Sequence, residues 1–262
     1  MHVPRKRFGQ HFLHDKQVIQ RLVNVIAPEP TQHLVEIGPG QGALTLPVLE
    51  KTGAMDVIEL DRDLIPILTE RCQAVGTLTV HQADALAFDF SALVKNDLPL
   101  RVIGNLPYNI STPLIFHLLE FAGSIIDMHF MLQKEVVDRL AANCGNSDYG
   151  RLSIMVQYHC QVTALFDVPP SAFHPPPKVD SRIVRIVPYQ TVPHVAKDYG
   201  HFEGLVRQAF SQRRKTLRNC LKRLMTDDAW KKSSIDPKLR PEQLTVADYV
   251  KLSNDLIESD NQ

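Results

Sequence analysis

The chain has 262 residues, of which 44% are hydrophobic, 22% charged and 7% aromatic. This composition excludes collagen, coiled coil and extensive disorder, and the length predicts one or two domains. No apolar run approaches the roughly 18 residues of a membrane span, and the basic start lacks the apolar core of a secretory signal. The four cysteines form no C-x-x-C pair, so we expect reduced thiols in a cytoplasmic protein and no metal site.

Charge is balanced overall but segregated along the chain. There are 29 basic and 29 acidic residues in total. Residues 1–190 carry 16 Lys and Arg against 19 Asp and Glu, whereas residues 200–262 carry 12 against 9. Seven basic residues and no acidic one lie between Arg207 and Arg223. Because local patches decide whether a polyanion binds, this segment is a candidate phosphate-contacting surface.

The first part of the chain alternates predicted helices and strands. Apolar residues at helical spacing predict a helix over 15–27, with Asp15 as its N-cap. Strands rich in Val, Ile and Leu are predicted at 33–38, 56–61, 77–84, 100–108 and 127–133. Helices are predicted between and after them at 41–51, 63–74, 113–121 and 134–142. This order indicates an α/β fold with a doubly wound, mostly parallel sheet.

The pattern changes after residue 150. Residues 153–168 and 181–189 are β-like, flank a proline-dense loop, and are expected to add an antiparallel edge to the sheet. Beyond residue 193 the sequence is typical of helices. We therefore predict two domains, 1–193 and a small helical domain over 194–262.

A glycine-rich turn joins the first strand of the sheet to its helix. Its glycines, among them Gly38 and Gly40, let the backbone pass close to a ligand at a helix N-terminus. With Ala43 they also satisfy G-x-G-x-x-A, so a dinucleotide is not excluded. The alternative is a tight connection that binds nothing.

Acidic residues end the next two strands. Glu59 and Asp61 lie about 20 residues past the turn, where a carboxylate accepts hydrogen bonds from ribose hydroxyls. The spacing does not separate these two residues, since strand alternation puts both on one face. Asp84 ends the third strand, at a level where it would reach an adenine amino group. Asp61 and Asp84 could instead cap the helices that follow them.

The fourth strand ends in Asn105-Leu106-Pro107-Tyr108, the most informative stretch of the chain. The adenine amine is a poor nucleophile because its lone pair is delocalised into the ring. The Asn105 carboxamide and the Leu106 carbonyl can accept both amine hydrogens and direct that lone pair at a methyl donor. Pro107 limits rearrangement of the turn, and Tyr108 can stack on the base. The alternative is a simple strand-to-turn transition.

Motifs along nearly the whole chain resemble those of the small-subunit (16S) ribosomal RNA adenine dimethyltransferases, within the S-adenosylmethionine-dependent, Rossmann-like methyltransferases. They are KRFGQHFL (6–13), EIGPGQGALT (36–45), VIELD (57–61), GNLPYNISTPL (104–114), HFMLQKEV (129–136), YGRLS (149–153), PPSAFHPPPKVDS (169–181) and FSQRRKTLRN (210–219). The resemblance implies methyl transfer from S-adenosylmethionine to N6 of two adjacent adenosines near the 3′ end of 16S rRNA. The partner would be the small ribosomal subunit or its precursor, with no membrane involved, and we expect a monomer.

The resemblance also implies roles for single residues. His11 and Leu13 would contact the methionine end of the cofactor. Gly38 and Gly40 would lie under the cofactor, with Glu59 on the ribose and Asp84 on the adenine. Asn105 would line both the cofactor and the target. Some members carry Asn in place of His11, and either side chain can hydrogen-bond a carboxylate. Phe173 would face Tyr108 across the flipped base, although its residue type alone favours a loop anchor in a small core.

Two basic segments would meet RNA. Residues 1–14 resemble a lid that orders on cofactor or RNA, although a basic tail is the usual interpretation of such a start. Residues 213–215 are expected on a helix, where a solvated face or a carboxylate bridge between domains are the alternatives. The candidate RNA-binding residues are Lys6, Arg7, Arg207, Arg213, Arg214, Lys215, Arg218, Lys222 and Arg223.

Three other functions share part of this pattern. A nicotinamide-dependent oxidoreductase would explain the turn and Glu59 but not Asn105 to Tyr108. A non-catalytic RNA-binding or ribosome-assembly factor would not need that segment. A large-subunit rRNA adenine methyltransferase of the antibiotic-resistance type is closer, but residues 210–219 look more like the small-subunit group. The cofactor would supply the reactive group, so neither a nucleophile nor a general base is predicted.

Overall fold

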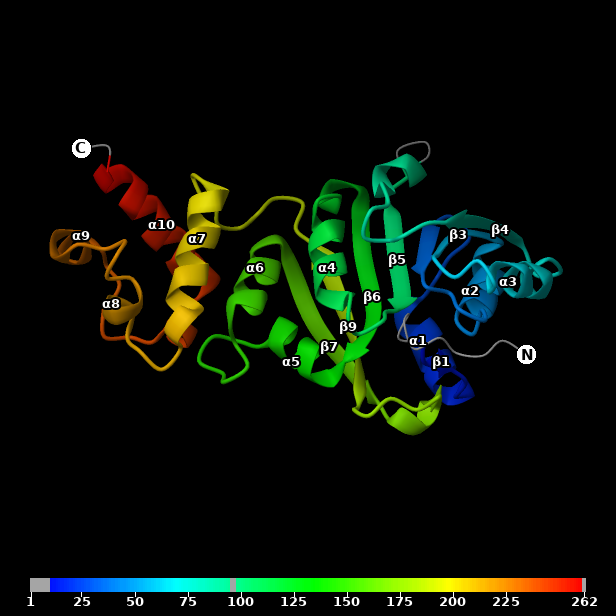
Figure 1. Ribbon diagram of the computed structural model, residues 1–262. Helices are drawn as coiled ribbons and strands as arrows, with labels where there is room; N and C mark the ends of the chain where they lie inside the picture. Colours follow the sequence, from blue (N-terminus) through cyan, green and yellow to red (C-terminus); the bar gives the residue numbers. More distant parts are fainter. Residues whose placement is uncertain (1–9, 95–97, 261–262) are drawn as a thin grey trace. The chain divides into compact units, whose positions relative to one another are not determined.

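The computed structural model describes residues 10–94 and 98–260 (Figure 1). The chain divides into two compact units, the first formed by residues 1–137 and 161–188 and the second by residues 138–160 and 189–262. The sequence predicts a boundary at residue 193, close to the change at residue 189. It does not anticipate that residues 138–160 belong to the second unit.

The first unit contains a seven-stranded sheet in the order β4-β3-β2-β5-β6-β9-β7. Its strands are β2 (His33–Ile37), β3 (Ala54–Glu59), β4 (Thr77–Gln82), β5 (Leu100–Asn105), β6 (Ile125–Gln133), β7 (Cys160–Val168) and β9 (Ser181–Pro188). The strands from β4 to β6 are parallel, and β9 is antiparallel to β6. The predicted α/β fold, a Rossmann-like, mostly parallel sheet with an antiparallel edge, is confirmed. A separate antiparallel pair joins β1 (Phe12–Leu13) to β8 (Phe173–His174).

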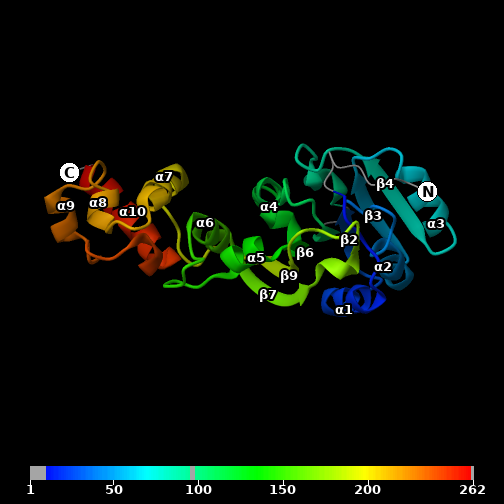
Figure 2. The same ribbon diagram turned by 60° about the horizontal axis from the view of Figure 1, so that its bottom comes forward.

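Helices of the first unit cover the sheet, with α1 and α2 on one face and α4 on the other (Figure 2). They are α1 (Lys16–Ile26), α2 (Thr45–Thr52), α3 (Ile65–Cys72), α4 (Ser111–Leu119), α5 (Lys134–Ala141, whose last residues join the second unit) and 3₁₀ helices at Phe90–Leu93, Ala122–Ser124 and Pro170–Ala172. Asp15 caps α1 as predicted, since its carboxylate accepts from the backbone N–H groups of Gln17 and Val18. The apolar stripe of α1 packs into one core cluster with strand residues such as Leu34 and Val57.

The second unit is helical. It contains α6 (Arg151–His159), α7 (Tyr199–Ala209), α8 (Leu217–Cys220), α9 (Asp227–Lys232), α10 (Val246–Asp260) and 3₁₀ helices at Phe210–Gln212 and Pro241–Gln243. α7 packs against α10, and both bury aromatic side chains, Phe202 and Tyr249 among them. From residue 194 to residue 260 the chain has no strand. Over the whole described chain, no helix has both the length and the apolarity needed to cross a membrane.

Two predicted elements are wrong. Residues 153–159 form part of α6 rather than a strand, because the apolar residues from Ile154 to Tyr158 are almost all buried and such a run does not distinguish a strand from a buried helix. Residues 213–215 lie in turns between short helices. There the backbone N–H groups of Leu217 and Arg218 donate to the carbonyls of Leu239 and Pro237, so no continuous helix forms.

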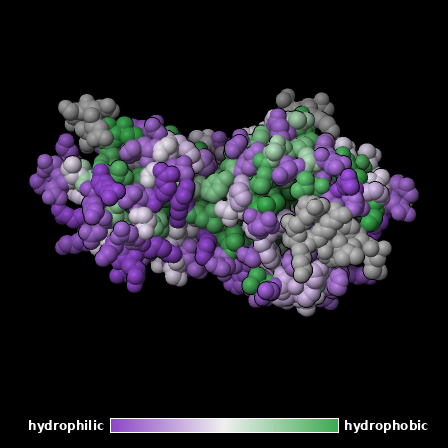
Figure 3. Space-filling model, viewed as in Figure 1, coloured by the Kyte–Doolittle hydropathy of each residue, from purple (hydrophilic) through white to green (hydrophobic). Residues whose placement is uncertain are grey.

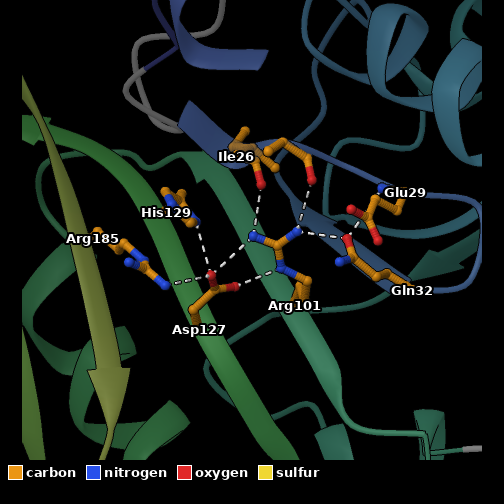
Figure 4. Close-up of polar contacts among 8 residues, drawn as sticks. Ile26, Glu29, Gln32, Arg101, Asp127, His129 and Arg185 are labelled. Carbon is orange, nitrogen blue, oxygen red and sulfur yellow. Dashed lines mark hydrogen bonds and ion pairs between the residues drawn. The ribbon is translucent and has the colours of Figure 1, made fainter. Parts of the chain in front are cut away.

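A buried ion pair lies at the amino end of β5 (Figure 4). The Arg101 guanidinium donates to both carboxylate oxygens of Asp127 on β6, at 2.8 and 2.9 Å. It also donates to the Ile26 carbonyl at 2.7 Å and to the Gln32 carboxamide oxygen at 2.6 Å. Arg101 is 7% exposed and Asp127 only 2%. The pair therefore fastens the C-terminal end of α1 to two central strands.

His129 lies beside this pair on β6. Its Nδ1 atom is 3.8 Å from the Asp127 carboxylate, and neither ring nitrogen has a hydrogen-bond partner in the described part of the chain. Burial lowers the pKa of His129 to about 4. The ring is therefore neutral near pH 7, and Arg101 remains the principal counterion of Asp127.

Candidate functional site

A cavity of about 1060 Å³ opens in the first unit at the carboxyl ends of the parallel strands. The strand order reverses between β2 and β5, and ligands bind at such switch points in open α/β sheets. Its walls include ten residues predicted from the sequence: His11, Leu13, Gly38, Gly40, Glu59, Asp84, Asn105, Leu106, Pro107 and Tyr108.

Glycines bring the backbone close to this cavity. Gly40 has a φ of +57°, and a Cβ atom there would lie 3.2 Å from the Phe12 ring. On β5, a Cβ atom at Gly104 would lie 2.6 Å from the Ile37 carbonyl oxygen. Only glycine fits both positions without a shift of neighbouring atoms. The turn after β2 therefore packs closely on Phe12, and the end of β5 packs closely on the end of β2.

The structure distinguishes the two acids that the spacing left open. Glu59 lines the cavity, and its carboxylate accepts the N–H groups of Asp61 at 2.8 Å and Gly40 at 3.2 Å. Burial raises its pKa. Asp61 is not among the lining residues; its carboxylate accepts from the Gln10 carboxamide at 3.0 Å. Glu59 is therefore the acid that a ligand would meet.

Asp84 is exposed and lines the cavity. Its carboxylate accepts the N–H of Leu86 at 2.9 Å. No helix begins at Asp84, so the carboxylate holds a turn rather than a helix N-terminus, and its second oxygen remains available in the cavity.

Glu36 is a cavity residue for which the sequence predicts no role. It is buried on β2 and accepts a hydrogen bond of 2.6 Å from the Thr45 hydroxyl at the start of α2. Burial raises its pKa to about 8, so the carboxyl group is mostly protonated at pH 7. A carboxylate within the apolar strand HLVEI was the sequence signal.

The segment after β5 presents hydrogen-bond acceptors to the cavity. The Asn105 carboxamide nitrogen donates to the His11 carbonyl at 2.9 Å. This contact points the carboxamide oxygen of Asn105 away from His11. The Leu106 N–H donates to the Met131 carbonyl at 3.2 Å. Within the described residues, neither the Asn105 carboxamide oxygen nor the Leu106 carbonyl has a partner. Two acceptors are thus available to a ligand.

Tyr108 and Phe173 differ in placement. The Tyr108 ring lines the cavity and stacks against His11, and burial raises the pKa of its phenol. Phe173 is 3% exposed, lies in the core cluster and does not line the cavity. It pairs with Leu13 across the β1–β8 ladder, and both side chains belong to the core cluster, whereas the neighbouring His174 lines the cavity. The prediction that Phe173 faces Tyr108 does not match this arrangement.

None of the basic candidates in the described residues lines the cavity. Lys6 and Arg7 lie outside the described residues. In the second unit, hydrophilic side chains predominate on the face shown in Figure 3. The exposed candidates there are Arg207, Arg213, Arg214, Lys215, Arg218, Lys222 and Arg223.

Two of these arginines have partners within the second unit. Arg213 donates to the carbonyl oxygens of Ser147 at 2.5 Å and Tyr149 at 2.9 Å, and Arg218 pairs with Asp227. Arg213 thus holds a loop through carbonyl groups rather than bridging to a carboxylate. In residues 10–94 and 98–260, no three His, Cys, Asp or Glu side chains are grouped to hold a metal ion.

A family model described as ribosomal RNA adenine dimethylase matches residues 1–258. The chain belongs to the ribosomal RNA adenine dimethylase family. This match confirms the resemblance drawn from the sequence motifs, and it extends through both compact units.

Individual relatives of this dimethylase agree with that assignment. Ribosomal RNA small subunit methyltransferase A of Pseudomonas syringae pv. syringae is 59% identical over 257 residues, which cover 98% of this chain and 96% of the relative. The protein of the same name from Acinetobacter baylyi is 56% identical, covering 98% and 93%. The crystal structure of a dimethyladenosine transferase from Plasmodium falciparum matches with a TM-score of 0.81 and 27% identity, covering 96% and 98%. The 23S rRNA methyltransferase ErmE shares the fold, with a TM-score of 0.74, 22% identity and coverage of 94% and 99%.

Proposed function

We propose that this protein transfers methyl groups from S-adenosylmethionine to N6 of two adjacent adenosines near the 3′ end of 16S rRNA, giving N6,N6-dimethyladenosines. The observation that carries the proposal is the pair of open acceptors at Asn105 and Leu106, beside an aromatic ring in the cavity. The substrate is the small ribosomal subunit or its precursor, as the names of the bacterial relatives suggest. The protein acts as a monomer in the cytoplasm.

The cavity fits the cofactor. Its volume accommodates a nucleoside and an amino acid together, and the close backbone approach at Gly40 leaves room under them. Glu59 would accept from the ribose hydroxyls and Asp84 from the adenine amino group. His11, Leu13 and Gly38 would hold the methionine end. When bound, S-adenosylmethionine supplies an electrophilic methyl group.

The chain itself orients and desolvates the target. The Asn105 carboxamide oxygen and the Leu106 carbonyl accept the two amine hydrogens, which favours a pyramidal nitrogen whose lone pair faces the donor. Pro107 fixes the turn between them. Tyr108 stacks on the adenine and holds it out of the RNA stack. The proton leaves to solvent, since no base is needed once the amine is cationic.

The second unit, with residues 194–262 as its main part, supplies the RNA-binding surface. Its exposed basic residues include Arg207, Arg214, Lys215, Lys222 and Arg223. Exposed positive charges bind RNA phosphates. Lys6 and Arg7 of the predicted lid also bind RNA. Phe173 would contact the target only if its ring left the core.

One experiment tests the proposal directly. The protein is incubated with labelled S-adenosylmethionine and under-methylated small subunits, and the modified bases are mapped. Two adjacent dimethylated adenosines near the 3′ end of 16S rRNA are expected. Label in 23S rRNA would identify a large-subunit enzyme, and a melting temperature raised by a nicotinamide cofactor instead would identify an oxidoreductase.

Replacing Glu59 with alanine is expected to weaken cofactor binding about tenfold to a hundredfold, because the ribose loses a charged acceptor. Calorimetry with S-adenosylmethionine measures the effect. The control is Asp89→Ala, which removes an exposed carboxylate outside the cavity. Unchanged affinity in the Glu59 variant would contradict the ribose assignment.

Replacing Arg214 and Lys215 together with alanine is expected to weaken binding to small subunits. It should flatten the dependence of log affinity on log salt by up to about 0.7–0.9 per lost phosphate contact. Cofactor affinity should not change. The triple variant that also loses Arg213 should in addition lose thermal stability, because Arg213 holds the loop at Ser147 and Tyr149. A double variant with the wild-type salt slope would exclude these two residues from the RNA surface.

A further inference from the structure

Tyr108 is held by two serines to which neither the sequence motifs nor the proposed reaction gives a role. Its phenol oxygen lies 2.8 Å from the Oγ atom of Ser181. The Ser111 hydroxyl donates to the Tyr108 carbonyl at 3.1 Å. The Ser181 contact differs from the other because it acts at the far end of the side chain, beyond the ring face that a base would meet.

Ser181 is a fixed anchor for that contact. It is fully buried and begins β9, where it lies opposite Gln133 in the antiparallel ladder with β6. β5 and β9 are not neighbours, since β6 lies between them. The hydroxyl pair therefore ties the segment after β5 to a strand two positions away, whose place the sheet determines.

The contact at the phenol oxygen constrains one degree of freedom of the ring. The oxygen lies on the axis that runs from Cβ through the ring, so the contact fixes the direction of the side chain but not rotation about that axis. The His11 ring, stacked at 5.9 Å and an interplanar angle of 27°, restricts the rotation. Stacking on a base depends on both properties, because offset aromatic pairs need a defined position and plane.

We propose that Ser181 is a positioning residue for methyl transfer, whose hydroxyl holds the Tyr108 ring where it stacks on the target adenine. The inference rests on the proposed function. Without the hydroxyl, the ring swings about χ1, and a smaller fraction of bound RNA presents its amine to the donor. The loss falls on kcat rather than on KM, because RNA is bound mainly by other residues.

The test compares three variants with wild type on under-methylated small subunits. Ser181→Ala is expected to lower kcat roughly tenfold, the usual scale for one lost hydrogen bond in a preorganised site. KM and cofactor affinity should stay within about twofold. Tyr108→Phe deletes the same contact from the other side and should lower kcat similarly. The double variant should be no slower than the slower single variant, because both remove one contact.

Thr52→Val is the matched control. It also deletes one buried hydroxyl in the first unit, bonded to the Val48 carbonyl at the end of α2, and Thr52 does not line the cavity. Melting temperatures of all variants separate instability from misplacement. A kcat for Ser181→Ala equal to that of Thr52→Val, or multiplicative losses in the double variant, would overturn the positioning role.

The outcomes separate this inference from the function on which it rests. A wild-type protein that does not methylate adenine overturns the proposed function. Tyr108→Ala with wild-type turnover overturns the stacking role, and the Ser181 role with it. If Ser181→Ala does not fold, Tyr108→Phe decides, since it keeps the ring, and a wild-type kcat there overturns the inference.

Discussion

Replacing Asn105 with alanine is expected to lower the rate of methyl transfer by about a hundredfold or more, on the scale of removing one preorganised polar group that acts in a transition state. In the proposed reaction, the carboxamide oxygen accepts a hydrogen bond from the target amine as the amine becomes nucleophilic. Cofactor affinity should remain within a few fold, because the proposed cofactor contacts of Glu59 and Asp84 are unchanged. Single-turnover transfer from S-adenosylmethionine to under-methylated small subunits measures the rate, and calorimetry the affinity.

A second substitution at Asn105 tests the same assignment. The Asn105 carboxamide nitrogen donates to the His11 carbonyl, so Asn105→Asp would keep an acceptor but set a carboxylate against a carbonyl oxygen. It should also be slow, with weaker cofactor binding through the displaced His11. Asn24→Ala, an exposed change on α1, is the control. Near-normal transfer by Asn105→Ala would refute the assignment.

Replacing Arg101 with leucine is expected to lower the free energy of unfolding of the first unit by about 3–5 kcal/mol. The variant leaves Asp127 as a buried carboxylate whose main counterion is gone, while Arg185, at 3.6 Å, is half exposed. The carbonyl of Ile26 also loses its donor. Urea unfolding, followed by circular dichroism, measures the change.

Two controls make the Arg101 result specific. Arg182→Ala removes a partly exposed ion pair with Asp167 and should cost under about 1 kcal/mol. The double variant Arg101→Leu/Asp127→Leu should recover much of the stability, because no charge is left buried alone. Cofactor affinity of folded Arg101→Leu should match wild type, since the pair and the cavity lie at opposite ends of β5. A loss below 1 kcal/mol would contradict the buried-charge account.

Sequence patterns anticipated the sheet because parallel strands buried on both faces are runs of Val, Ile and Leu. The cavity residues followed from the same logic, since strand ends meet at one edge of the sheet and Gly38, Glu59, Asp84 and Asn105 each end or follow a strand. The strand predicted at residues 153–159 is wrong for a related reason, because a buried helix has the same continuous run of apolar residues as a buried strand.

Other features depend on register and were outside the reach of local patterns. The pairing of Arg101 with Asp127 requires knowing that β5 and β6 are neighbours and which residues face each other. The Tyr108–Ser181 contact joins residues 73 positions apart. Phe173 pairs with Leu13 in the core cluster, and both residues lie on segments that look like loops in the sequence. Such contacts are long-range, so spacing along the chain carries no trace of them.

β5 separates two groups of strands that have different proposed roles. On one side, β2, β3 and β4 lead to Gly38, Glu59 and Asp84, the proposed donor pocket. On the other side, β9 supplies Ser181, which touches the donor pocket nowhere. Asn105, at the end of β5, is proposed to serve both sides. With this division, substitutions on the acceptor side can adapt the protein to a new base or a new RNA. The binding site for the methyl donor then stays unchanged.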